Sequence, residues 1–89
     1  MTEVAFSSSF KRAFKRRIKG NALLEARFWE RLEIFQSNPF DQRLRTHKLS
    51  GRLKDLWSFS IEYDLRVVVS FLESERALFV DIGTHEEVY

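Results

Sequence analysis

The sequence predicts an α+β fold in which two N-terminal helices pack on a mainly antiparallel sheet. Apolar residues recur at helical spacing in two segments before Pro39. Apolar and polar residues then alternate from Trp57 to Ile61, and an almost continuous apolar run follows from Leu65 to Leu72. Helices that precede a group of strands, rather than alternating with them, are typical of α+β proteins.

The first helix is expected between the serines at positions 7 to 9 and Gly20. A short apolar segment, Val4–Phe6, precedes these serines, any of which can cap a helix through its side-chain oxygen. One helical face then carries the apolar residues: Phe10, Ala13, Phe14 and Ile18. Lysines and arginines occupy the other faces, and Gly20 ends the helix.

A second helix is expected to begin after Asn21, which can cap it, and to stop before Pro39. Its apolar residues again recur at helical spacing: Leu24, Phe28, Leu32 and Phe35. The glutamates between them are expected to face water: Glu25, Glu30 and Glu33. Because the turn between the two helices is short, they are predicted to form an antiparallel hairpin packed on a flat surface.

The rest of the chain is expected to supply the sheet. Segment Trp57–Ile61 alternates apolar residues with Ser58 and Ser60, the pattern of a strand with one buried face. The β-branched run Leu65–Leu72 predicts a central strand, and Ala77–Ile82 predicts a third. The connections are short and polar, so these strands are predicted to be neighbours in an antiparallel meander.

The segment from Phe40 to Lys54 has no clear period and is interpreted as a loop. After Phe40, its regular apolar anchors are Leu44, Leu49 and Leu53. We expect this loop to lead into the first strand of the meander and to pack over the sheet edge.

Length and composition favour one domain that spans residues 1–89. Hydrophobic residues make up 44% of the chain, and nine Phe and two Trp provide apolar material for one core. The lack of Cys excludes a disulfide scaffold and thiol-based catalytic or metal sites. No apolar stretch approaches the roughly 20 residues that span a bilayer, and no export signal is recognisable. We therefore expect a cytoplasmic protein without membrane contact.

Positive charges gather in two blocks, although the net charge is only +2. The first block contains Lys11, Arg12, Lys15, Arg16, Arg17 and Lys19. The second lies in the expected loop and contains Arg43, Arg45, Lys48, Arg52 and Lys54. Two such blocks indicate a polyanionic partner, and the alternative is that both are ordinary solvated surfaces.

Arg66 lies inside the most apolar segment, where a charged side chain requires an anion beside it. One interpretation is a structural carboxylate, for which the candidates are Asp64, Asp81 and Glu62. The other is a phosphate, which suits the fixed fork of guanidinium donors.

His85 follows the last predicted strand, where a histidine can exchange a proton near neutral pH, although a lone histidine often has no role. His47 lies in the basic loop. Tyr89 can either stack on a base or cover the sheet edge. The sequence contains no motif for zinc, nucleotide phosphate or a serine nucleophile.

Three segments taken together resemble the RelE-like toxins, in particular their YafQ-like branch. The resemblance is carried by residues between His47 and Ser58, by Asp64–Val68 and, most specifically, by Ile82–Tyr89. With the helical pair it covers nearly the whole chain. It implies a curved, mainly antiparallel four-stranded sheet in the order β-α-α-β-β-β, with Val4–Phe6 as the first strand.

The resemblance also implies that the protein is the toxin of a type II toxin–antitoxin system. Members of this family cleave messenger RNA, in many cases in the ribosomal A site, and the 2′-hydroxyl of the RNA attacks the adjacent phosphate. No metal, other cofactor or protein nucleophile is required. The expected partners are therefore a cognate antitoxin, messenger RNA and the small ribosomal subunit.

Matched by position, the resemblance implies that Arg66 stabilises the phosphate, that His85 is the general acid and that Tyr89 orients a base of the RNA. His47 matches a YafQ-like histidine and is a candidate base or phosphate contact. The second basic block is expected to contact RNA through Arg43, Arg45, Lys48, Arg52 and Lys54.

Ser58 and Ser60 depart from the family pattern, because relatives carry proton-transferring residues at these positions. This leaves three candidates for the general base: His47, Lys48 and Lys54. Two other functions stay open, a ParE-like toxin that inhibits DNA gyrase and a basic module that binds RNA or the ribosome without chemistry.

Overall fold

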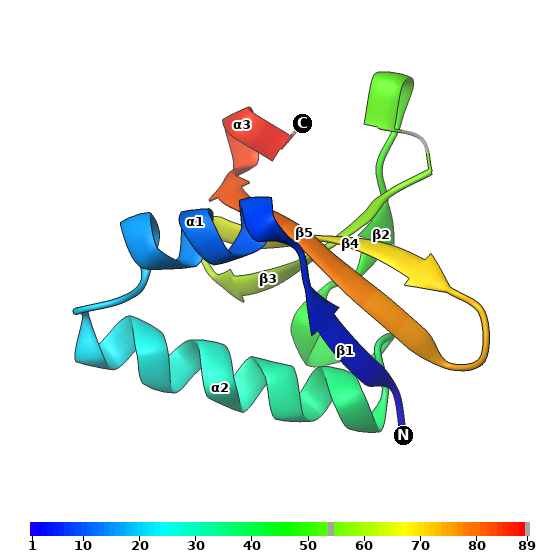
Figure 1. The fold of residues 1–89 in the computed structure, drawn as a ribbon, viewed down its shortest axis with the longest axis horizontal. Helices are drawn as coiled ribbons and strands as arrows, with labels where there is room; N and C mark the ends of the chain where they lie inside the picture. Colours follow the sequence, from blue (N-terminus) through cyan, green and yellow to red (C-terminus); the bar gives the residue numbers. More distant parts are fainter. Residues whose placement is uncertain (54, 89) are drawn as a thin grey trace.

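The computed structural model describes residues 1–53 and 55–88, with the side chain of Arg52 excepted. Figure 1 shows a layer of helices against a sheet, with a short helix near the C-terminus on the far side of the strands. The elements in chain order are β1 Glu3–Phe6, α1 Ser8–Arg17, α2 Ala22–Ser37, η1 Gln42–Leu44, β2 His47–Lys48, η2 Gly51–Leu53, β3 Trp57–Glu62, β4 Leu65–Leu72, β5 Arg76–Thr84 and α3 His85–Val88. No helix in the described part of the chain is long and apolar enough to cross a membrane.

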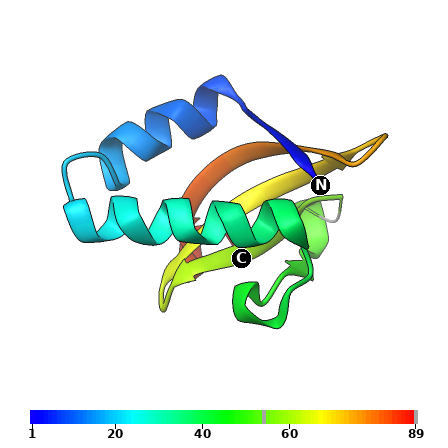
Figure 2. The same ribbon diagram turned by 90° about the horizontal axis from the view of Figure 1, so that it is seen from below.

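The sheet confirms the predicted α+β class and the mainly antiparallel arrangement. Its strand order is β1-β5-β4-β3-β2, and β3, β4 and β5 form the expected meander. β1 pairs in parallel with β5, with Val4 opposite Ala77. Figure 2 shows how the long strands curve beneath the helical layer.

The expected count of four strands is wrong, because the sheet has five. The extra strand, β2, lies inside the segment that was interpreted as a loop. It pairs antiparallel with β3, with His47 opposite Ser58 and Lys48 opposite Trp57. Both of its side chains are exposed, so the strand is held by its main chain and leaves no alternating pattern in the sequence.

The two predicted helix caps are confirmed. Ser7 Oγ accepts a hydrogen bond from the backbone N–H of Phe10 at 3.0 Å, and Asn21 Oδ1 accepts one from Leu24 at 3.2 Å. Between the helices, Gly20 has a φ of 92°, a conformation that L side chains rarely adopt. The chain can therefore reverse direction directly after α1, and α2 runs back beside it (Figure 2).

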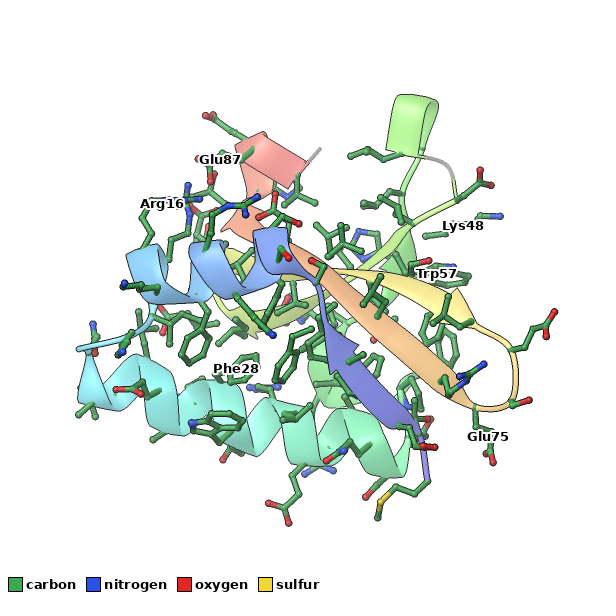
Figure 3. All side chains as sticks on the ribbon, in the orientation of Figure 1. Arg16, Phe28, Lys48, Trp57, Glu75 and Glu87 are labelled. Atoms are coloured by element: carbon green, nitrogen blue, oxygen red, sulfur yellow. The ribbon has the colours of Figure 1, made fainter. Side chains whose placement is uncertain are left out.

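The main core lies between the helices and one face of the sheet. It is rich in phenylalanine, and Phe28 of α2 points from its helix into this layer (Figure 3). Its ring centroid lies 5.8 Å from that of Phe10 in α1 and 6.5 Å from that of Phe79 in β5. One aromatic cluster thus joins both helices to the central part of the sheet.

A smaller cluster covers the opposite face of the sheet. Val68 belongs to it, whereas its neighbours Val67 and Val69 belong to the main core, as expected for alternate residues of a strand. Leu49 and Val88 are buried against Val68. This second cluster fixes α3 and the segment after β2 on the sheet face that α1 and α2 leave open.

Candidate RNA-binding and catalytic site

A broad, open pocket of about 1040 Å³ lies at the end of the sheet where β3 turns into β4 and β5 runs into α3. β2 pairs with the first two residues of β3, Trp57 and Ser58. The pocket lies beside the later part of β3, from Ser60 to Glu62. Four parts of the chain line it: Arg27 and Arg31 of α2; Gln42, Arg43 and Arg45 at η1; Ser60 to Asp64 with Arg66 from the β3–β4 hairpin; and Thr84, His85 and Glu86.

Arg66 projects from β4 into this pocket. It stands opposite Ser60 on β3 and Gly83 on β5. The residue is half-buried, and its Nη1 donates a hydrogen bond to Ser60 Oγ at 2.7 Å. The hydroxyl orients one end of the guanidinium, whose fork of donors suits the oxygens of a phosphate.

His85 lines the same pocket as Arg66, as the first residue of α3. Its backbone N–H donates to Asp64 Oδ1 at 3.2 Å, which ties the start of α3 to the β3–β4 turn. The structure therefore brings together two of the predicted catalytic residues, which are 19 positions apart in the sequence (85 − 66).

Arg43 and Arg45, two of the predicted RNA contacts, also line the pocket. The Arg43 guanidinium donates to both carboxylate oxygens of Asp41, at 3.0 and 2.9 Å. These side-chain hydrogen bonds, followed by one from the backbone N–H of Arg43, lower the pKa of Asp41 to about 2. Asp41 thus stays ionised and holds the Arg43 side chain, while Arg45 makes no ion pair within the described residues.

Arg27 and Arg31 were missed by the sequence analysis. They lie one helical turn apart on α2 and line the pocket from the side of the helical layer. Arg31 Nη1 donates to the carbonyl oxygen of Arg43 at 2.6 Å, so α2 also positions the segment at η1. The available signal was their spacing of four residues, which places two cations on one helical face.

His47 and Lys48 lie on β2 and do not line this pocket. In Figure 3, Lys48 stands far from Glu87 and α3. The Nδ1 atom of His47 lies 2.9 Å from the carbonyl oxygen of Arg45, which can only accept a hydrogen bond. In the neutral ring the proton therefore resides on Nδ1, and Nε2 is the basic nitrogen.

Three further predicted residues cannot be placed. Lys54 and Tyr89 lie outside the described residues, and so does the side chain of Arg52. The RNA contacts expected from Arg52 and Lys54, and the stacking role expected for Tyr89, remain predictions.

The charges around the pocket suit an anion. Five arginines and His85 face three carboxylates, those of Glu62, Asp64 and Glu86. Arginine forks bind phosphate oxygens well, and the open shape admits an extended chain rather than a small enclosed ligand. Among residues 1–53 and 55–88, no group of three His, Asp or Glu side chains could hold a metal ion.

Comparison with known proteins places the chain beside bacterial toxins. The model of the family described as "Bacterial toxin of type II toxin-antitoxin system, YafQ" matches residues 2–89. No curated protein sequence is significantly similar to the chain.

Several solved structures share the fold. A YoeB/ParE toxin from Agrobacterium tumefaciens matches with a TM-score of 0.79 at 16% identity, over 94% of this chain and 99% of the toxin. A metal-bound toxin from Helicobacter pylori matches with a TM-score of 0.78 at 23% identity, over 100% of both chains. A chain of the E. coli DinJ–YafQ complex matches with a TM-score of 0.66 at 17% identity, over 100% of this chain and 99% of the other.

Proposed function

Because the chain belongs to the YafQ family of bacterial type II toxins, we propose that it is an endoribonuclease that cleaves messenger RNA without a metal ion. The observation that carries this proposal is that Arg66 and His85 line one open, arginine-rich pocket. A cation for the phosphate and a proton donor for the leaving group are the two parts that such a reaction needs most.

The reaction is an attack of the RNA 2′-hydroxyl on the adjacent phosphate, followed by departure of the 5′-oxygen. Arg66, held by Ser60 at 2.7 Å, stabilises the negative charge that grows on the phosphoryl oxygens. His85 gives a proton to the departing 5′-oxygen. Arg27, Arg31, Arg43 and Arg45 bind neighbouring phosphates of the strand.

His47 is the base in this proposal. Its Nδ1 contact with Arg45 leaves Nε2 as the proton acceptor and ties the imidazole to a residue that lines the pocket. Lys48 and Lys54 are the other candidates from the sequence. The proposal requires the bound strand to extend from the pocket to β2, so that Nε2 of His47 comes within hydrogen-bond reach of the 2′-hydroxyl. Where the RNA is held in this reactive geometry, positioning supplies much of the rate, so a weak base is sufficient.

The proposed partners are messenger RNA, the A site of the small ribosomal subunit and an antitoxin, all in the cytoplasm. The E. coli relative is seen in a complex named DinJ–YafQ, which supports a protein partner of this kind. An acidic segment that folds on the arginine-rich pocket would exclude RNA from it.

The proposal is tested by expressing the protein from a tight promoter and mapping the 5′ ends of cellular messenger RNA. We expect new ends inside coding regions, and we expect His85→Ala to reduce them about 10²- to 10⁴-fold, the usual contribution of a general acid. Arg76→Ala, in the distant β4–β5 hairpin, is the matched control and should cleave as the unchanged protein does.

Growth arrest without new 5′ ends would contradict the proposal and favour a ParE-like inhibitor of gyrase. If the His85→Ala variant arrests growth and binds RNA as strongly as the unchanged protein, the chain is a binding module without chemistry.

A further inference from the structure

α3 is a single helical turn, His85–Val88, and yet it carries the proposed general acid. A helix this short does not form by itself in water, because nucleation fixes several residues for a single hydrogen bond. The position of His85 therefore depends on contacts that hold α3 from outside.

We propose that Glu87 is a positioning residue that holds His85 in its reactive place, through a capping box with Thr84 and an ion pair with Arg17. This inference rests on the proposed ribonuclease function. It assigns Glu87 no contact with RNA, and it gives the N-terminal helix α1 a role in the geometry of the site.

The capping box stabilises the N-terminal end of α3. The backbone N–H of Thr84 donates to Glu87 Oε1 at 2.7 Å, and the backbone N–H of Glu87 donates to Thr84 Oγ1 at 3.3 Å. This reciprocal pair satisfies two donors at the start of a helix. His85 lies between the two partners in sequence, so the box fixes its main chain directly.

The second carboxylate oxygen of Glu87 ties α3 to α1. Arg17 Nη2 lies 2.5 Å from Glu87 Oε2, although the two residues are 70 positions apart. The Arg17 side chain is only 26% exposed, and the apolar face of α1 anchors its helix in the main core. In Figure 3, Glu87 projects from α3 toward the end of α1 where Arg16 is labelled. The ion pair thus holds the single turn of α3 in place against α1, which is anchored in the main core.

Two packing contacts support the same arrangement. A Cβ atom at Gly83 would come within 3.2 Å of Glu87 Cβ, Glu87 Oε1 and Val88 Cγ2, so a residue without a side chain lets α3 fold back this closely. Val88 is buried in the small cluster with Val68. The backbone N–H of His85 is itself held by Asp64.

The charge of Glu87 persists at neutral pH. The hydrogen bond from the Thr84 backbone, followed by that from Arg17, lowers the pKa of Glu87 below its usual range. The neighbouring Glu86 lines the pocket instead. Two adjacent glutamates therefore point to different surroundings, and of the two it is Glu87 that pairs with α1.

The test compares single-turnover cleavage of two RNA oligonucleotides by the purified protein, with ribosomes where these are required. One has the ordinary 5′-oxygen at the scissile phosphate, and the other has a bridging 5′-sulfur, which leaves as a thiolate without needing a proton. The variants are Glu87→Gln, which keeps the shape of the side chain but removes its charge, Arg17→Met, and the two combined.

On the ordinary RNA, each single variant should lose up to about 100-fold in the rate at saturating protein, the loss that a misplacement of about 1 Å can produce. RNA affinity should stay unchanged. The double variant should be no slower than the slower single variant, because both changes break one link. On the 5′-sulfur RNA all three should match the unchanged protein, and Arg17→Lys should recover part of the loss.

Glu75→Gln and Arg76→Met repeat the same chemical changes in the distant β4–β5 hairpin and should have no effect. Rates are taken well below the measured Tm of each variant, so that unfolding is excluded. An equal loss on both RNAs, additive losses or a loss of affinity alone would overturn the inference. If the unchanged protein cleaves neither RNA, the ribonuclease proposal fails, and this inference fails with it.

Discussion

Among single residues, Asp41 offers the clearest pH dependence. Its folded pKa of about 2 lies below the ordinary value of 3.8, because Arg43 donates hydrogen bonds to the carboxylate. A group with a lowered folded pKa stabilises the native state above its unfolded pKa, and this stabilisation disappears as the pH falls through the folded pKa.

We therefore expect Asp41→Asn to lower the Tm at pH 5 to 7. The difference in Tm between this variant and the unchanged protein should shrink as the pH falls from 3.8 toward about 2. Thermal unfolding followed by circular dichroism over this range measures it. Asp55→Asn, at another exposed aspartate, is the control and should follow the unchanged protein. A difference that persists unchanged at pH 2 would contradict the assignment.

Arg66 shows which part of the candidate site could be predicted from the sequence. Its apolar surroundings indicate that a polar partner must meet the guanidinium. The sequence alternatives were carboxylates or a phosphate, whereas the structure adds a hydrogen bond to Ser60. That contact depends on the β3–β4 register, which shifts between Ser60 and Glu62, and a strand period alone does not specify such a shift.

Among the elements, α1 depends on how its first turn is joined to β5. Ser7 Oγ caps the helix at Phe10 and donates to the carbonyl oxygen of Val80 at 3.0 Å. Ser9 Oγ donates to the same carbonyl oxygen at 2.6 Å. The pairing of β1 with β5 ends at Phe6 and Phe79. The hydrogen bonds of Ser7 and Ser9 extend the contact with β5 by one more residue, Val80.

Replacing Ser7 with Ala should lower the free energy of unfolding by about 0.5 to 2 kcal/mol, the usual effect of losing an N-cap. Urea denaturation measures this change. Ser8→Ala is the matched control, because within the described residues the side chain of Ser8 makes none of these bonds, and it should stay within about 0.5 kcal/mol. Equal losses in the two variants would show that helix propensity, rather than the cap, is responsible.

The elements that could be predicted are those with a clear apolar pattern. α1 and α2 show a helical period and capping residues, and β3 alternates apolar residues with serines. β4 is covered on both faces and shows instead as a continuous apolar run. β2 and α3 are too short to show a period, and main-chain pairing or a capping box holds each of them. Arg27 and Arg31 lie on the predicted helix α2, but the period of a helix does not specify which end of the sheet it covers, so their place in the pocket was not predicted.

For the whole molecule, stability depends on a single aromatic cluster that joins both layers. Phe28 is fully buried, and its ring contacts those of Phe10, Phe14 and Phe79. Phe28→Ala should therefore lower the free energy of unfolding by about 3 to 5 kcal/mol, a large part of the total for a small domain. Leu23→Ala, on the same helix but 84% exposed, should change it by less than about 0.5 kcal/mol. A small effect at Phe28, measured by urea denaturation, would contradict the described core.

The pairing of β1 with β5 also determines when the protein can fold during synthesis. The contact between Ser7 and Val80 spans 73 positions, so β1 and the N-terminal end of α1 gain their partners only after β5 has been synthesised. Contacts of such long sequence separation form slowly, because a long loop must close first. While a ribosome translates the message, the helical pair is made long before β5, the strand that completes its core, and the native sheet closes only after β5 has been made as well.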